Sequence, residues 1–184
     1  VFVDSVLAWT VEHPPGRPNW PPRFHWVGTM GTRVTASETL YRGRVFELRK
    51  DQIVFEDGRE SSVELVVHPG AVALIPIDEQ QQIWFVRQYR HASGGELLEL
   101  PAGTLEPGEP PEQCAQRECQ EEIGMFPGKL EHLGGFFLAP GYSTEFLEVY
   151  LASQLRPGPR PPDADEQIRV EKLKGEAGGE IIFD

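Results

Sequence analysis

The stretch Gly103–Met125 constrains the chain more than any other, because it gathers carboxylates on one predicted helix. Residues 109–123 contain no glycine, and their prolines fall where a helix can begin, so this segment is predicted to be helical. An α-helix has 3.6 residues per turn, which places Glu118 one turn from Glu122, with Glu121 beside them. Three acidic side chains therefore share one face of the predicted helix.

This acidic face needs an explanation, because like charges at this spacing destabilise a helix by roughly 0.2–0.5 kcal/mol per pair. Arg117 can neutralise only part of the charge. Hard divalent cations prefer oxygen ligands, so the face indicates a metal site. The alternative is an acidic helix face that is simply solvated.

The spacing of charged residues and glycines around this helix is specific. The frame consists of Gly103, Glu109, Arg117, Glu118, Glu121, Glu122, Gly124 and Met125. It resembles the Nudix box, the loop–helix–loop signature of the Nudix hydrolases, and every charged and glycine position of that signature is matched. Cys119 is the only departure, since the family usually carries an aliphatic residue there. A buried cysteine packs as a small hydrophobe, so the change affects packing more than chemistry.

The resemblance implies an α/β fold, a Nudix α/β/α sandwich with a mixed β-sheet, preceded by an N-terminal antiparallel β meander. We expect an irregular N-terminal extension over residues 1–29, the meander and its dimer contacts over 30–68, and the Nudix hydrolase domain over 69–184. Residues 1–29 are rich in tryptophan and proline, and proline disfavours a helix there.

Sequence patterns also predict individual elements. Within the meander we expect strands in 39–50 and 52–56, with a hairpin turn at 57–58. The nearly all-apolar run 71–77 is expected to be a strand buried on both faces. The glycine-rich segment 173–180 stands where the family normally has a final helix, so that helix is expected to be short, disordered or absent.

The composition excludes several partners. A formal net charge of −12 argues against binding to nucleic acid or to an anionic membrane, since both are polyanions. No run approaches the roughly 18 apolar residues of a membrane span, and no signal segment opens the chain. Cys114 and Cys119 are the only cysteines, and they lie about 140° apart around the predicted helix, so they should not bridge each other. Reduced thiols favour a cytoplasmic protein.

The N-terminal meander and three phrases, residues 86–90, 98–103 and 139–142, resemble the ADP-ribose pyrophosphatase branch of the family. The resemblance implies that four residues in them bind substrate: Arg90, Glu99, Pro140 and Tyr142. The Arg90 guanidinium can clamp phosphate oxygens with two bonds, although arginine at a strand end is also often a plain surface charge. The substrate match is weakened by residues 144–145, which are Thr-Glu where the branch often has Asp-Glu.

For the metal site, the resemblance implies four ligands: the carbonyl of Ala102 and the carboxylates of Glu118, Glu121 and Glu122. Mg²⁺ is the expected ion, because it accepts a few carboxylates while it retains waters and substrate phosphates as ligands, and Mn²⁺ could substitute. Arg117 is expected to orient the carboxylates, and Glu109 is expected to support them from outside the ligand set.

A general base is expected in addition, since a carboxylate bound to a cation is a poor proton acceptor. The proline-rich connector 156–162 leads into an acidic loop, 163–166, and the resemblance favours Glu166 in that loop as the base. Glu121 on the helix is the alternative base. A solvated loop without a catalytic role is the alternative for 163–166.

Together these features predict a metal-dependent enzyme that hydrolyses ADP-ribose to AMP and ribose 5-phosphate. The alternatives are another nucleoside diphosphate sugar or a dinucleotide as substrate, such as GDP-mannose, NADH or a diadenosine polyphosphate. A Nudix-like binding module without catalysis is the alternative from another class, and the complete set of box carboxylates argues against it. The resemblance also implies a homodimer that shares its active sites.

Overall fold

The computed structural model describes residues 31–161 and 167–174 of the chain. The N-terminal extension, the candidate base Glu166 and the segment expected to replace a final helix, from residue 175 on, lie outside the described residues. The described residues fall into two compact units. Residues 31–69 and 141–144 belong to the first unit, and all other described residues belong to the second.

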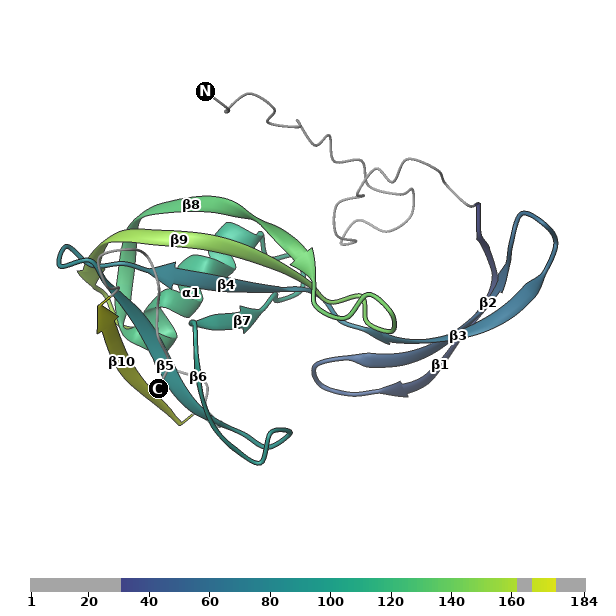
Figure 1. The fold of residues 1–184 in the computed structure, drawn as a ribbon, viewed down its shortest axis with the longest axis horizontal. Coiled ribbons are helices and arrows are strands. Elements are labelled where there is room, and N and C mark those ends of the chain that lie inside the picture. The colour runs from purple at the N-terminus through teal and green to yellow at the C-terminus, as the bar shows by residue number, and fades with distance from the viewer. Residues whose placement is uncertain (1–30, 162–166, 175–184) are drawn as a thin grey trace, which may run out of the picture. The chain divides into compact units, whose positions relative to one another are not determined.

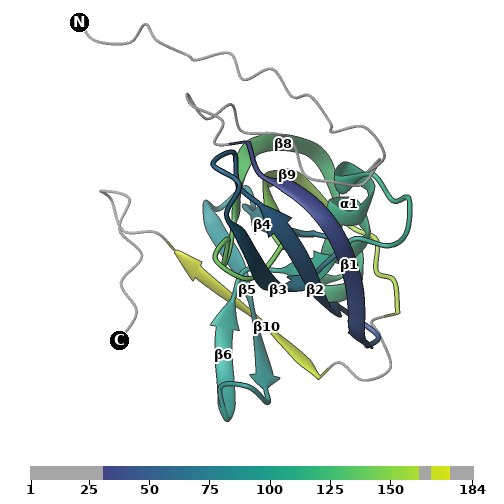
Figure 2. The same cartoon turned by 90° about the vertical axis from the view of Figure 1, so that its right-hand side faces the viewer.

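The first unit is an antiparallel meander of three strands that lie side by side (Figure 2). The strands are β1 (Arg33–Arg42), β2 (Glu47–Val54) and β3 (Glu60–Val67). The predicted turn at 57–58 joins β2 to β3, and Gly58 adopts a φ of 83° that glycine tolerates best. The prediction of one strand over 39–50 was wrong. The chain turns at 43–46, where the Gly43 amide donates to the Phe46 carbonyl at 2.9 Å.

The second unit contains two sheets, which Figure 1 shows around the single helix of the described residues. One sheet has the strand order β7-β4-β9-β8 and is mixed. In it, β4 runs parallel to β9, whereas β7 is antiparallel to β4 and β8 is antiparallel to β9. The other sheet has the order β10-β5-β6 and is antiparallel. Their bounds are β4 (Ala71–Pro76), β5 (Gln82–Arg90), β6 (Gly95–Glu99), β7 (Ala102–Thr104), β8 (Met125–Phe137), β9 (Phe146–Pro157) and β10 (Ile168–Lys174).

Helix α1 (Pro111–Ile123) forms where the sequence predicts it. Proline at its first turn needs no intrahelical donor, and Gly124 ends the helix in the left-handed conformation, with a φ of 69°. The buried side of α1 carries four small or apolar residues and two glutamates: Cys114, Ala115, Glu118, Cys119, Glu122 and Ile123. The apolar members pack on Val72, Leu74, Val86, Tyr150 and Ala152 from the sheets. The core of the second unit therefore fixes the helix that bears the acidic face.

Strand β4 is buried over almost its whole length, which confirms the prediction for the apolar run 71–77. The long strand β8 was not predicted, because its sequence mixes glycine, charge and apolar residues without strict alternation. Both cysteines are free and buried, as expected from their separation around the helix. Among the described residues, no helix is long and apolar enough to cross a membrane.

Candidate active site

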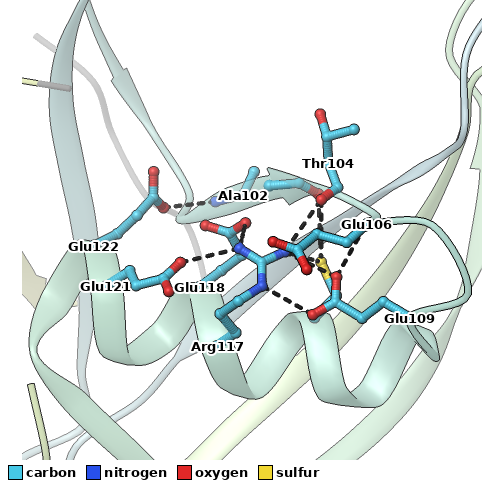
Figure 3. A network of polar contacts seen from close by, with 10 residues as sticks. Ala102, Thr104, Glu106, Glu109, Arg117, Glu118, Glu121 and Glu122 are labelled. Carbon is cyan, nitrogen blue, oxygen red and sulfur yellow. Dashed lines mark hydrogen bonds and ion pairs between the residues drawn. The ribbon is translucent and has the colours of Figure 1, made fainter. Parts of the chain in front are cut away.

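Arg117 is the centre of the polar network on α1 (Figure 3). Its guanidinium donates to Glu109 through Nε and Nη2, both at 2.9 Å. Its Nη1 donates to Glu118 at 2.6 Å and to Glu121 at 3.0 Å. The side chains of Arg117, Glu109, Glu118 and Glu121 are each at most 18% exposed, so the ion pairs are shielded from solvent. One cation therefore holds three of the box carboxylates in place.

Glu122 is held by the backbone of β7. Its Oε2 accepts a hydrogen bond from the backbone amide of Ala102 at 2.8 Å (Figure 3). Ala102 begins β7, which pairs with β4, so the bond ties the helix to the edge of the mixed sheet. Residue 102 lies beside the acidic face, where its carbonyl was expected to act.

Gly103 lies directly against the carboxylate of Glu118. A Cβ atom added to Gly103 would meet Glu118 Oε1 at 1.7 Å, far inside van der Waals contact. The φ of Gly103 is not in the left-handed region, so space rather than backbone conformation requires glycine here. The close approach of β7 to α1 leaves room for Glu118 only because position 103 has no side chain.

Glu109 and Arg117 shift each other's pKa. Hydrogen bonds from Arg117, opposed by burial, lower the pKa of Glu109 below its ordinary value of 4.5. The hydrogen bond to Glu109 and the charge of Glu118 raise the pKa of Arg117 further above its usual range. Glu109 and Arg117 are therefore both charged at neutral pH.

Cys114 is a member of this network that the sequence did not single out. Arg117 Nη2 lies 3.2 Å from Cys114 Sγ, and burial raises the pKa of this thiol well above its ordinary value. Only the three-residue spacing between Cys114 and Arg117 could have suggested the contact. Burial likewise raises the pKa of Cys119 to about 12, so both thiols stay protonated at neutral pH.

Arg90 and Glu99, both predicted to bind substrate, lie together in the sheet formed by β10, β5 and β6. Arg90 Nε donates to Glu99 Oε2 at 2.9 Å, and Nη2 lies 2.8 Å from the same oxygen. The side chain of Arg90 is 45% exposed, so the guanidinium keeps donors open to solvent. Pro140 belongs to the second unit, whereas Tyr142 belongs to the first and is 61% exposed.

Comparison with known proteins decides the family. A model of the NUDIX domain matches residues 67–176, which is more than half of the chain. The chain belongs to the Nudix family. The expected α/β Nudix fold is also supported by a crystal structure of an ADP compounds hydrolase, which is 24% identical in sequence, gives a TM-score of 0.68 and covers 78% of each chain.

Two relatives that are named for their activity share much of this Nudix sequence. An ADP-ribose pyrophosphatase of Mycobacterium tuberculosis is 44% identical over 133 residues, which are 72% of this chain and 64% of that protein. An ADP-ribose pyrophosphatase of Bacillus subtilis is 34% identical over 142 residues, or 77% of each protein. The match therefore spans just under two thirds of the M. tuberculosis protein. The predicted resemblance to the ADP-ribose pyrophosphatase branch is confirmed.

Nudix hydrolases generally use a divalent metal, and the donors on α1 suit one in chemistry. Glu118, Glu121 and Glu122 offer only carboxylate oxygens, the ligands that hard cations prefer. Gly103 leaves the space beside Glu118 that a side chain would fill. In the described part of the chain, however, no three acidic, histidine or cysteine side chains are already gathered as a metal-binding group. The carboxylates are instead held by Arg117 and by the Ala102 amide.

Proposed function

We propose that this protein hydrolyses the pyrophosphate bond of ADP-ribose in a metal-dependent reaction and releases AMP and ribose 5-phosphate. The observation that carries the proposal is the buried acidic network of α1, in which Arg117 holds Glu118 and Glu121 within 3.0 Å. Two ADP-ribose pyrophosphatases, 44% identical over 133 residues and 34% identical over 142 residues, support the choice of substrate.

Glu118, Glu121 and Glu122, with the carbonyl of Ala102, are the proposed metal ligands, and Mg²⁺ is the proposed ion. When bound, Mg²⁺ supplies positive charge that offsets the charge of the diphosphate and favours attack on phosphorus. Arg117 keeps the carboxylate of Glu118 directed across α1, and Glu109 in turn fixes the guanidinium plane with two hydrogen bonds. These contacts reduce the reorganisation that ion binding requires.

Arg90 is the proposed clamp for the substrate phosphates. Its guanidinium already bonds Glu99, which fixes the plane of the fork while other donors remain open. A guanidinium fork binds phosphate oxygens in two parallel hydrogen bonds. Pro140 and Tyr142 are proposed as further substrate contacts, on the strength of the family phrase in which they stand.

The proposed general base is Glu166, with Glu121 as the alternative. Glu121 is bonded to Arg117 at 3.0 Å and is also a proposed metal ligand. A carboxylate that binds a metal ion is a poor proton acceptor, which favours a base from elsewhere. Glu166 lies outside the described residues, and the case for it rests on its acidic loop and the family resemblance.

A homodimer is also proposed. Every residue of β1 is exposed, and large apolar side chains on and beside that strand face solvent: Val34, Leu40, Tyr41, Val45 and Phe46. Large apolar side chains exposed in such number on one strand and the turn that follows it are typical of a protein–protein contact. A cytoplasmic location stays a prediction, based on the two reduced thiols.

A substrate panel tests the proposed function directly. Purified protein with Mg²⁺ is incubated with ADP-ribose, GDP-mannose, UDP-glucose, NADH and diadenosine polyphosphates, and kcat/KM is measured for each. The proposal expects the highest value for ADP-ribose, with AMP and ribose 5-phosphate as products. A higher kcat/KM for another member of the panel would reassign the substrate, and no hydrolysis of any member would favour a binding module.

A further inference from the structure

Gln88, two residues before the C-terminal end of β5, carries a buried polar atom that the described residues do not satisfy. The residue is only 7% exposed. Its side-chain Oε1 is buried and accepts no hydrogen bond from any residue that the structure describes. A buried acceptor without a donor destabilises a folded protein, so such atoms are uncommon and call for an explanation. A donor on a bound molecule would satisfy this oxygen.

The position of Gln88 on β5 shows which residues its side chain lies beside. Alternate residues of a strand share a face, so Gln88 lies on the face of both Val86 and Arg90. Val86 packs in the core beneath α1, whereas Arg90 pairs with Glu99 at 2.9 Å. Gln88 is opposite Leu97 on β6, which makes Glu99 its diagonal neighbour. The Gln88 side chain therefore lies between the core that carries the acidic helix and the proposed phosphate clamp.

The chemistry of Oε1 limits what it can bind. A carboxamide oxygen is an acceptor only. The oxygens of a diphosphate are also acceptors at neutral pH, so they can bind Arg90 but cannot satisfy Gln88 Oε1. The hydroxyl groups of a ribose next to the diphosphate are donors and match it.

We propose that Gln88 is a substrate-binding residue whose Oε1 accepts a hydrogen bond from a sugar hydroxyl of the nucleoside diphosphate sugar. The assignment rests on the proposed function and adds to it a determinant for the sugar. Arg90 selects the charge of the diphosphate, and Gln88 selects a hydroxyl-bearing group beside it. Arg90 and Gln88 lie two residues apart on one strand and bind adjacent parts of one substrate.

The first test is the variant Gln88→Met, which keeps the length of the side chain and removes the acceptor. Without ligand, the melting midpoint should rise by about 2–4 °C, because an unsatisfied buried polar atom is lost. KM for ADP-ribose should rise about 5- to 30-fold with little change in kcat, because the lost bond is made equally in the ground and transition states. Gln82→Met is the matched control on the same strand and face, and its KM should equal that of the wild type.

The second test uses ADP-ribose analogues that each lack one hydroxyl of either ribose. For one analogue, wild type and Gln88→Met should show the same KM, since both partners of the bond are then absent. An equal loss with every analogue would overturn the assignment to a hydroxyl. An unchanged KM for ADP-ribose, or a lower melting midpoint for the free variant, would also overturn it.

These experiments distinguish an error in the role of Gln88 from an error in the proposed function. A wild type that does not hydrolyse ADP-ribose contradicts the proposed function itself. A wild type that hydrolyses ADP-ribose, beside a Gln88→Met variant with the same KM, contradicts only the role of Gln88. The melting midpoint requires no activity at all.

Discussion

Gly103 and Glu118 share so little space that a single Cβ atom on the glycine would lie 1.7 Å from the carboxylate oxygen of the glutamate. The close packing of strand β7 on helix α1 creates this contact. Because Glu118 is also bonded to Arg117 at 2.6 Å, the glycine and the arginine together determine where the carboxylate can lie. The glycine of the Nudix box thus acts here through the carboxylate it accommodates.

The variant Gly103→Ala should therefore displace the Glu118 carboxylate while the fold is kept. The obstructing atoms are Oε1, Cδ and Cγ of Glu118, which all belong to one flexible side chain that can rotate away. Because Glu118 is a proposed ligand, its displacement should weaken the apparent affinity for Mg²⁺ by about 10–100-fold. Activity titrated with Mg²⁺ measures the change. Gly95→Ala is the control, since its new Cβ would meet no atom within 4 Å, and the same shift in both variants would contradict the steric account.

The ion pair between Glu109 and Arg117 predicts a pH-dependent contribution to stability. The pKa of Glu109 is lower in the folded protein than its ordinary value of 4.5, mainly through the hydrogen bonds from Arg117. A lowered pKa means that the folded state favours the charged carboxylate. Its stabilising contribution is therefore present above about pH 4.5 and is lost as the pH falls through the folded-state pKa.

The variant Glu109→Gln removes this contribution. At pH 7 it should lower the free energy of unfolding by about 1–3 kcal/mol, the usual effect of losing hydrogen bonds to a charged partner. Urea denaturation without divalent ions, at pH 7 and at pH 3, provides the measurement. The gap between variant and wild type should narrow at pH 3. A gap of the same size at both pH values would show that the charge of Glu109 is not responsible.

The sequence predicts a feature of this structure where the residues that determine the feature lie close together along the chain. Helix α1 was predicted because its proline, its terminal glycine and its acidic spacing all lie within one short segment. The hydrogen bond from Ala102 to Glu122 was not predicted, because it joins residues twenty positions apart and depends on how β7 packs on α1. Gln88 also gave no signal, since only the folded sheet shows that its side chain is buried. Tertiary packing creates these features, and local sequence patterns do not encode them.

The identity of the base is tested by two glutamine variants at saturating Mg²⁺. Loss of a general base typically lowers the rate by about 10²–10⁴-fold, so Glu166→Gln should lower kcat within that range and leave KM nearly unchanged. Measurement of kcat against pH for Glu166→Gln and Glu121→Gln separates the candidates. Wild-type turnover in Glu166→Gln, with loss in Glu121→Gln, would place the base on α1.

The exposed apolar residues of the meander predict a dimer at micromolar concentration. Tyr41, which is 58% exposed, should lie in its interface. Sedimentation velocity should therefore give the mass of two chains for the wild type and a larger monomer fraction for Tyr41→Asp. A fully active wild-type monomer would exclude a shared active site.

The central claim is that the acidic face of α1 holds a divalent ion on which hydrolysis of ADP-ribose depends. The most direct measurement is the rate of AMP release from ADP-ribose by wild type and by Glu122→Gln, each with Mg²⁺, in EDTA, and after excess Mg²⁺ is restored. We predict that chelation abolishes the wild-type rate, that Mg²⁺ restores it, and that the folded Glu122→Gln variant stays inactive throughout. Wild-type release of AMP in EDTA, or full turnover by Glu122→Gln with Mg²⁺, would contradict the claim.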